Sequence, residues 1–253
     1  RDAVHDDIAN VKAAAVHHGA PHVFMSAASP GVVSLFFHNA YYKTHEEYLF
    51  AIADAMQYEY EAIASAGIIL QLDCPDLGMG RHIQYADLPI EEFRKKARLH
   101  IDALNHATRN IAPEQMRMHL CWGNYEGPHT YDVPFAKIAA ACFRARPQGL
   151  SFEGANPRHE HEWEDFARAK IPADKILIPG VLDSTSSFVE HPELVADRLC
   201  RYASAVGREN VIAGTDCGFG TFAGRPGIVP SVMWAKMRAM AEGAKLASKT
   251  LWG

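Results

Sequence analysis

A histidine and a cysteine two residues apart, His119 and Cys121, stand in the segment RMHLCWGN. If the apolar residues before them form a β-strand, side chains at positions i and i+2 point to the same side. The segment then presents an imidazole and a thiol together at the end of one strand. Zinc binds both groups and usually takes four ligands from Cys, His, Asp or Glu. We therefore expect other strand ends to supply the missing ligands.

Apolar runs alternate with helical patterns along the chain, and five of these runs end at or just before a reactive side chain. These side chains are Asp73, Cys121, Glu153, Asp183 and Cys217. Continuous apolar strands that alternate with helices are typical of a parallel sheet covered on both faces. The expected strands are residues 22–27, 67–73, 115–121, 149–153, 175–183 and 210–217, and the expected main helices are residues 3–18, 45–66, 89–110, 133–145, 191–206 and 230–249.

This arrangement favours an α/β barrel, because the loops after the strands of a (β/α)8 TIM-type barrel converge on its active site. An open doubly wound sheet would also gather ligands at that edge, but the sequence has no G-x-G-x-x-G and no P-loop motif. We predict one catalytic barrel domain over residues 1–253. Six expected strands are two fewer than a barrel needs, and the chain does not begin with Met. We therefore expect an N-terminally truncated barrel that lacks its first one or two β/α units.

Composition narrows the classes of function. The chain has 253 residues, of which 48% are hydrophobic and 22% charged, and its net charge is −5. Because it has no basic run, we expect no nucleic-acid partner, and because it has no long apolar window, we expect no membrane partner. A polar N-terminus and five scattered cysteines predict a cytoplasmic, reducing location. An incomplete barrel exposes sheet edges, so we expect a homo-oligomer or a partner chain to cover them.

Three strand ends together give a candidate zinc site of His119, Cys121, Glu153 and Cys217. Two thiolates and an imidazole are soft ligands that favour zinc over magnesium or calcium. The negative charge of this set suits the binding of a substrate thiol and its conversion to a thiolate. Glu153, a hard oxygen ligand, would be the most easily displaced. Taken singly, the same residues also fit a core histidine, a salt-bridged glutamate and small buried cysteines.

These motifs resemble the catalytic barrel of the cobalamin-independent methionine synthase family. In that family an H-x-C, a Glu after an apolar strand and a Cys in a D-C-G turn bind the zinc that activates homocysteine. Here they stand as HLC at 119–121, SFE at 151–153 and TDCG at 215–218, and the resemblance runs over essentially the whole chain. It implies Zn2+ as the cofactor. The segment GIILQLDCPDL implies that Asp73 contacts the amino-acid part of the substrate.

The segments HLCWGNYEGPH and FEGANPRHEHEW look more like the branch of this family that includes epoxyalkane:coenzyme M transferase. Cys74 replaces a carboxylate that is usual in methionine synthases, and Thr185 stands near the position of their histidine linked to proton delivery. The branch shares zinc-thiolate activation but alkylates other thiols. The predicted function is therefore zinc-dependent transfer of a methyl or other alkyl group from a donor to a small-molecule thiol.

Three loop residues, Asn124, Arg158 and His159, are predicted to bind substrate. Arg158 could hold a carboxylate or a sulfonate through its planar guanidinium, although a salt bridge to a nearby Glu fits equally well. His159 could line the pocket, support the zinc ligands, or form a second metal site with His161. Two alternative hypotheses for the function stay open. The protein could be a zinc hydrolase or lyase on the same barrel, or an inactive fragment with a structural metal.

Overall fold

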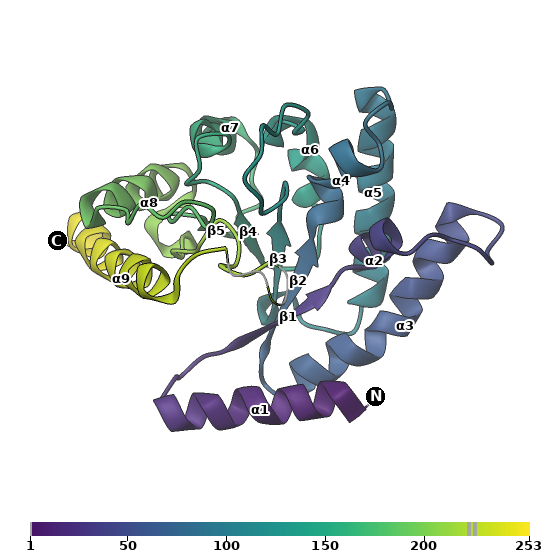
Figure 1. Cartoon of the computed structure of the whole chain (residues 1–253), viewed down its shortest axis with the longest axis horizontal. Helices are drawn as coiled ribbons and strands as arrows, with labels where there is room; N and C mark the ends of the chain where they lie inside the picture. The colour runs from purple at the N-terminus through teal and green to yellow at the C-terminus, as the bar shows by residue number, and fades with distance from the viewer. Residues whose placement is uncertain (1, 222–223, 225–226) are drawn as a thin grey trace. The chain divides into compact units, whose positions relative to one another are not determined.

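The computed structural model describes residues 2–221, 224 and 227–253 (Figure 1). Within them the chain has an α/β fold with a parallel five-stranded sheet in the order β1-β2-β3-β4-β5. The parallel sheet was predicted, and its closure into a barrel stays a prediction. The strands are β1 (Phe24–Ala28), β2 (Ile69–Cys74), β3 (Met116–Leu120), β4 (Gly149–Phe152) and β5 (Ile176–Pro179).

The sixth predicted strand, residues 210–217, is not a regular strand in the structure. It meets the β5 segment only through two isolated parallel bridges, Leu177 to Val211 and Gly180 to Gly214. Pro179 lies between the two bridges and has no N–H group to donate, so the ladder of hydrogen bonds is interrupted there. The prediction of a strand was wrong, although the segment does run beside β5.

The chain divides into two compact units. Unit 1 comprises residues up to His119 together with Ala140–Gly149, and unit 2 comprises Leu120–Ala139 and Leu150–Gly253. That residues 1–253 form one domain stays a prediction. None of the described helices is long and apolar enough to cross a membrane.

Unit 1 contains β1 to β3 and most of the N-terminal helices. The long helix α3 begins with a reciprocal cap, because Thr44 Oγ1 accepts from the Glu47 N–H at 3.1 Å and Glu47 Oε2 accepts from the Lys43 N–H at 3.1 Å. Gly67, at φ 76°, follows its end. The helices are α1 (Asp2–His18), α2 (Pro30–Phe36), α3 (His45–Ser65), α4 (Gly80–Ile83) and α5 (Ile90–Ala107), with 3-10 turns η1 (Pro75–Leu77) and η2 (Pro113–Gln115).

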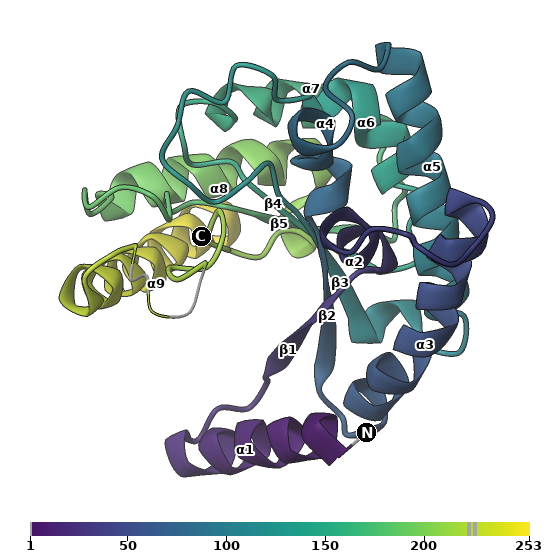
Figure 2. The same cartoon turned by 45° about the vertical axis from the view of Figure 1, so that its right-hand side comes forward.

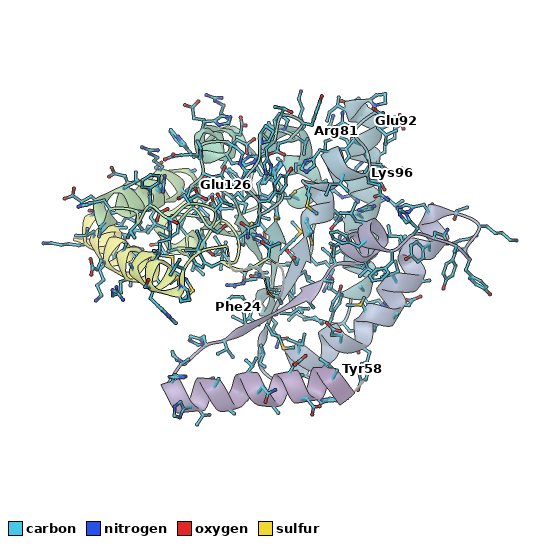
Figure 3. The ribbon with its side chains drawn as sticks, viewed as in Figure 1. Phe24, Tyr58, Arg81, Glu92, Lys96 and Glu126 are labelled. Atoms are coloured by element: carbon cyan, nitrogen blue, oxygen red, sulfur yellow. The ribbon has the colours of Figure 1, made fainter. Side chains whose placement is uncertain are left out.

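The two faces of the sheet in unit 1 differ. Leu70, Leu72 and Met118 belong to the buried face, and α3 packs on β2 and on α5. Side chains at alternate positions, among them Gln71 and Arg117, are only partly buried. Phe24, labelled in Figure 3, belongs to this second set and is 47% exposed. The second face is therefore the more polar and open one.

Unit 2 contains β4, β5 and the C-terminal helices. Helices α8 and α9 lie side by side in both views (Figure 1, Figure 2). A Cβ at Gly243 of α9 would lie 2.5 Å from the Val195 side chain of α8, so glycine permits this close approach. The helices are α7 (Trp163–Arg168), α8 (Pro192–Val206) and α9 (Pro230–Trp252), with 3-10 turns η3 (Glu160–Glu162) and η4 (Arg208–Asn210); α6 (Phe135–Cys142) crosses the unit boundary.

Candidate metal centre

Three of the four predicted zinc ligands lie together. His119 is on β3, Cys121 follows the end of the same strand, and Cys217 lies in the turn after the bridged segment. One potential ligand atom from each lies within 4.8 Å of the others, and all three residues are buried. The two sulfur atoms are 3.4 Å apart. The site can therefore offer an imidazole and two thiols to one metal ion.

The donor set fits zinc. Two sulfurs on one tetrahedral zinc, each at about 2.3 Å from it, lie roughly 3.8 Å apart, close to the separation seen here. Burial and the charge of Arg117 lower the pKa of His119 to about 4, so its imidazole is neutral at pH 7 and has a free lone pair. Gly123, at φ 112°, donates its N–H to Cys121 Sγ at 3.2 Å, which holds this sulfur in place.

Without a cation, the surroundings of Cys217 disfavour its thiolate form. The hydrogen bond with Cys121, followed by burial and the negative charge of Glu153, holds the pKa of the Cys217 thiol well above its ordinary value. A divalent cation would reverse this balance, because a coordinated thiol loses its proton. The site is therefore suited to a cation.

Glu153, the fourth predicted ligand, is buried at the end of β4 and held by hydrogen bonds. Its Oε1 accepts from the Trp122 N–H at 2.7 Å and lies 3.9 Å from Cys217 Sγ. Its Oε2 accepts from Asn156 Nδ2 at 2.8 Å and from Arg158 Nη2 at 3.0 Å. Coordination by Glu153 would require Oε1 to turn from the Trp122 amide toward the metal, and it stays a prediction.

A buried carboxylate of the TDCG motif that had no predicted role, Asp216, links the loop after Glu153 to the loop of Cys217. Its Oδ1 accepts from the N–H groups of Gly154 and Ala155, both at 2.8 Å. Its Oδ2 accepts from the N–H and the side-chain amide of Asn156 at 2.9 and 2.8 Å. Burial and the charge of Glu153 raise the pKa of Asp216 to about 7, although these hydrogen bonds oppose the shift.

Asn124, a predicted substrate-binding residue, connects three loops. Its Nδ2 donates to Gly218 O and to Thr221 Oγ1, both at 2.7 Å, and its Oδ1 accepts from Ser184 Oγ at 2.9 Å. Ser184 Oγ in turn accepts from the Cys217 N–H at 3.2 Å. Asn124 therefore fixes the loop after Cys121 to the loop around Cys217, while a contact with substrate stays a prediction.

His159 is buried between two carboxylates. Its Nδ1 lies 2.9 Å from Glu162 Oε2, and its Nε2 lies 3.2 Å from Asp132 Oδ2. Burial lowers its pKa, but the bonds to Asp132 and Glu162 outweigh burial and raise it to about 9. The ring stacks on Trp122 with centroids 4.1 Å apart, so an imidazolium lies on the indole.

The two neighbours of His159 in the predicted motif behave differently. Arg158 pairs with Glu153 at 3.0 Å and lies 3.8 Å from Asp132, so carboxylates already compensate its charge. His161 is exposed. In the part of the chain that the structure describes, His119, Cys121 and Cys217 form the one group of three or more such side chains that could hold a metal. Substrate binding by Arg158 and by His159 stays a prediction.

Asp73 lies at the end of β2 in unit 1. Burial and the neighbouring charge of Asp76 raise its pKa to about 6. Asp76 is itself buried, accepts from Ser29 Oγ at 2.7 Å and pairs with His100 Nδ1 at 2.8 Å. Asp76 was not among the predicted site residues, although it stands in the P-D-L turn directly after β2. Contact of Asp73 with the substrate stays a prediction.

No protein-family model matches the chain. Over 232 residues it is 23% identical to the methionine synthase of Saccharolobus solfataricus, and 22% identical to that of Saccharolobus islandicus strain L.S.2.15 / Lassen #1. Each alignment covers 90% of this chain. The chain is similar to methionine synthases over most of its length. The predicted resemblance to that family is thus confirmed, at low identity.

The structural comparison shows a similar fold. A B12-independent methionine synthase from Shewanella sp. W3-18-1, solved in complex with selenomethionine, matches with a TM-score of 0.71 at 19% identity. The match covers 91% of this chain and 63% of the Shewanella chain. The chain also spans only 59% of the two Saccharolobus relatives. Placement nearer to the epoxyalkane:coenzyme M transferase branch stays a prediction.

Proposed function

We propose that this protein transfers a methyl or other alkyl group to a substrate thiol, with zinc held by His119, Cys121, Cys217 and Glu153. The observation that carries the proposal is the buried group of one imidazole and two thiols within 4.8 Å. The names of the methionine synthase relatives support alkyl transfer to sulfur as the reaction class.

Zinc bound there would lower the pKa of a substrate thiol and keep it as a nucleophilic thiolate at neutral pH. The thiolate sulfur would attack an electrophilic carbon of the alkyl donor, and the leaving group would depart with the bonding electron pair. Glu153 is suited to yield its place to the incoming thiol, because hydrogen bonds from Trp122, Asn156 and Arg158 hold its carboxylate when it is not a ligand. Asp73 would orient the thiol, through an amino group if the substrate carries one.

The predicted small-molecule thiol and alkyl donor, the cytoplasmic location and a covering partner chain or second copy all belong to this proposal. So does the barrel, because its converging loops would bring the donor and the thiol to one place.

The first experiment is the zinc content of purified protein by elemental analysis. We expect about one zinc per chain in the wild type and a clear loss in Cys121→Ser and in Cys217→Ser. Cys200→Ser is the matched control, because Cys200 lies in α8 among the C-terminal helices and outside the metal-binding group. Full zinc content in the Cys121 and Cys217 variants would contradict the ligand set.

A second experiment separates thiol alkylation from a zinc hydrolase or lyase. In cobalt-substituted protein, an added thiol should change the sulfur-to-cobalt charge-transfer band, because a new sulfur ligand joins the metal. An unchanged band, together with turnover that depends on metal-bound water, would refute thiol activation. If the band changes but no alkyl group is transferred to the thiol, the metal site binds thiols and the proposed transferase activity is wrong.

A further inference from the structure

Arg117 is a partly buried cation on the open face of the sheet in unit 1. It stands on β3, two residues before His119, so both side chains project to the same side of the strand. Alternation along β2 places Gln71 and Asp73 on one face as well, and the parallel register sets Ser26 opposite Gln71. Hydrogen bonds link Arg117 to Gln71 and Gln71 to Ser26, which confirms that the three strands share this face.

The guanidinium of Arg117 is held in one orientation. Its Nε donates to Gln71 Oε1 at 2.6 Å, and Gln71 Nε2 in turn donates to Ser26 Oγ at 3.1 Å. Its central carbon lies 3.3 Å from the centre of the Phe24 ring, so one flat face of the group is covered. These contacts use Nε and one face of the plane. The edge that carries the two Nη atoms makes no hydrogen bond within the described residues.

The charge of Arg117 is also unpaired. No carboxylate in the part of the chain that the structure describes forms an ion pair with it. This differs from Arg158, which the sequence proposed as the anion-binding residue and whose charge Glu153 and Asp132 compensate. A partly buried guanidinium that lacks a counter-charge and keeps its two-nitrogen edge open is preorganised for a bidentate oxyanion.

The position of Arg117 relates this site to the proposed chemistry. Positions i and i+2 of a strand are about 7 Å apart, so Arg117 lies about that far from His119 along β3. A short thiol whose sulfur approaches the metal centre beside His119 could extend an anionic end along β3 toward Arg117. Gln71 of β2 contacts Arg117. Asp73 lies two residues after Gln71 on the same face, nearer to the carboxyl end of the strand.

We propose that Arg117 binds the carboxylate, or an equivalent oxyanion, of the thiol substrate through the open edge of its guanidinium. The assignment to a thiol substrate rests on the proposed function. The site therefore selects anionic thiols over neutral or cationic thiols of the same length. Phe24 and Gln71 fix the geometry of the guanidinium, and Arg117 supplies the charge.

The test compares two thiols that differ at one end, 3-mercaptopropionate and 2-mercaptoethanol, by titration of the charge-transfer band of cobalt-substituted protein. In the wild type we expect 3-mercaptopropionate to bind about tenfold more tightly or better, which is typical of a charge-assisted bidentate contact. In Arg117→Gln the two thiols should bind equally, with the affinity for 2-mercaptoethanol unchanged. Arg94→Gln removes a half-buried charge from α5 that pairs with Glu91, and it should keep the wild-type preference.

Two results would overturn the proposal: equal affinities in the wild type, or an unchanged preference for 3-mercaptopropionate in Arg117→Gln. Arg117→Lys adds a finer test, because it keeps the charge but loses the fork, and it should retain only part of the preference.

A metal-free arm separates this proposal from the proposed function. Phenylglyoxal modifies arginine, and mass spectrometry follows each site in chelator-treated protein. Propionate should slow the modification of Arg117 and leave that of Arg94 unchanged; equal rates with and without propionate would refute the oxyanion site. If propionate protects Arg117 but no thiol changes the cobalt spectrum, the oxyanion site stands and zinc-dependent thiol activation is wrong.

Discussion

Replacing Asp216 with Asn should destabilise the protein although the two side chains have almost the same shape. The carboxylate accepts four hydrogen bonds, two on each oxygen, from the loop of Gly154 to Asn156. An amide can keep only the two on its oxygen, and its NH2 group then faces two N–H donors in a buried site. Each lost bond to a charged acceptor is worth about 1.5–3 kcal/mol, so the loss is roughly 3–6 kcal/mol.

The net loss is smaller than that range, because the charge of Asp216 is itself costly. Burial and the charge of Glu153 raise the pKa of Asp216 to about 7, and the neutral amide removes that cost. That cost is roughly 4 kcal/mol for a pKa raised from 3.8 to about 7, so we expect the free energy of unfolding to fall by only about 1–2 kcal/mol. The assay is urea unfolding at pH 8, where the carboxylate is ionised, in the presence of a chelator so that bound metal adds no stability.

Asp183→Asn is the matched control. Asp183 also follows a strand, but both of its hydrogen bonds, from the N–H and hydroxyl of Thr185, are made to Oδ1. An amide oxygen can keep both, so this variant should lose less than about 1 kcal/mol. Equal losses in the two variants, or a loss below about 1 kcal/mol in Asp216→Asn, would refute the four-bond argument.

Three further predictions concern other buried groups. The pKa of His159 is raised from 6.5 to about 9, so its protonated form stabilises the folded protein by about 3 kcal/mol. This contribution is complete below pH 6.5 and is lost as the pH rises through 9. Urea unfolding at a series of pH values should show the loss, and His159→Gln should remove this pH dependence. Gly31→Ala should lower the free energy of unfolding by several kcal/mol, because the added Cβ would lie 2.0 Å from Asp76 Oδ2. Gly80→Ala is the control and should be nearly neutral, because nothing lies within 4 Å of its Cβ. Thermal unfolding measures both variants. Mild oxidation of metal-free protein should join Cys121 to Cys217, whose sulfurs are 3.4 Å apart, and zinc should block this product in mass spectra; an unjoined pair would argue against the geometry.

Much of the fold was predictable because its strands are buried on at least one face and read as apolar runs. The predicted strand 67–73 corresponds to β2 (Ile69–Cys74), and the predicted helix 45–66 to α3 (His45–Ser65). Helix α2 was missed, since its small residues and Pro30 suggested a loop. Its signal was nevertheless present, because Ser29 caps the helix by accepting the Val32 N–H at 3.0 Å and Pro30 occupies its first turn.

The candidate metal centre was predictable for a different reason. Thiols and imidazoles are rare side chains, and the carboxyl ends of parallel strands meet at one edge of a sheet. Reactive residues at predicted strand ends are therefore expected to lie near one another. Partners such as Asp216 with Asn156, or His159 with Asp132, could not be found in this way. They are 60 and 27 residues apart, respectively, and lie in loops whose course no periodicity predicts.

Trp122 offers a way to observe the site without a label. Its indole is 1% exposed, follows Cys121 directly and stacks on the ring of His159. Among the four tryptophans of the chain, Trp234 and Trp252 are exposed, so their emission should lie at longer wavelength. A protonated imidazole quenches a stacked indole, so the emission of Trp122 should rise as His159 loses its proton above pH 9. The titration of His159 can thus be followed by tryptophan fluorescence in the native chain.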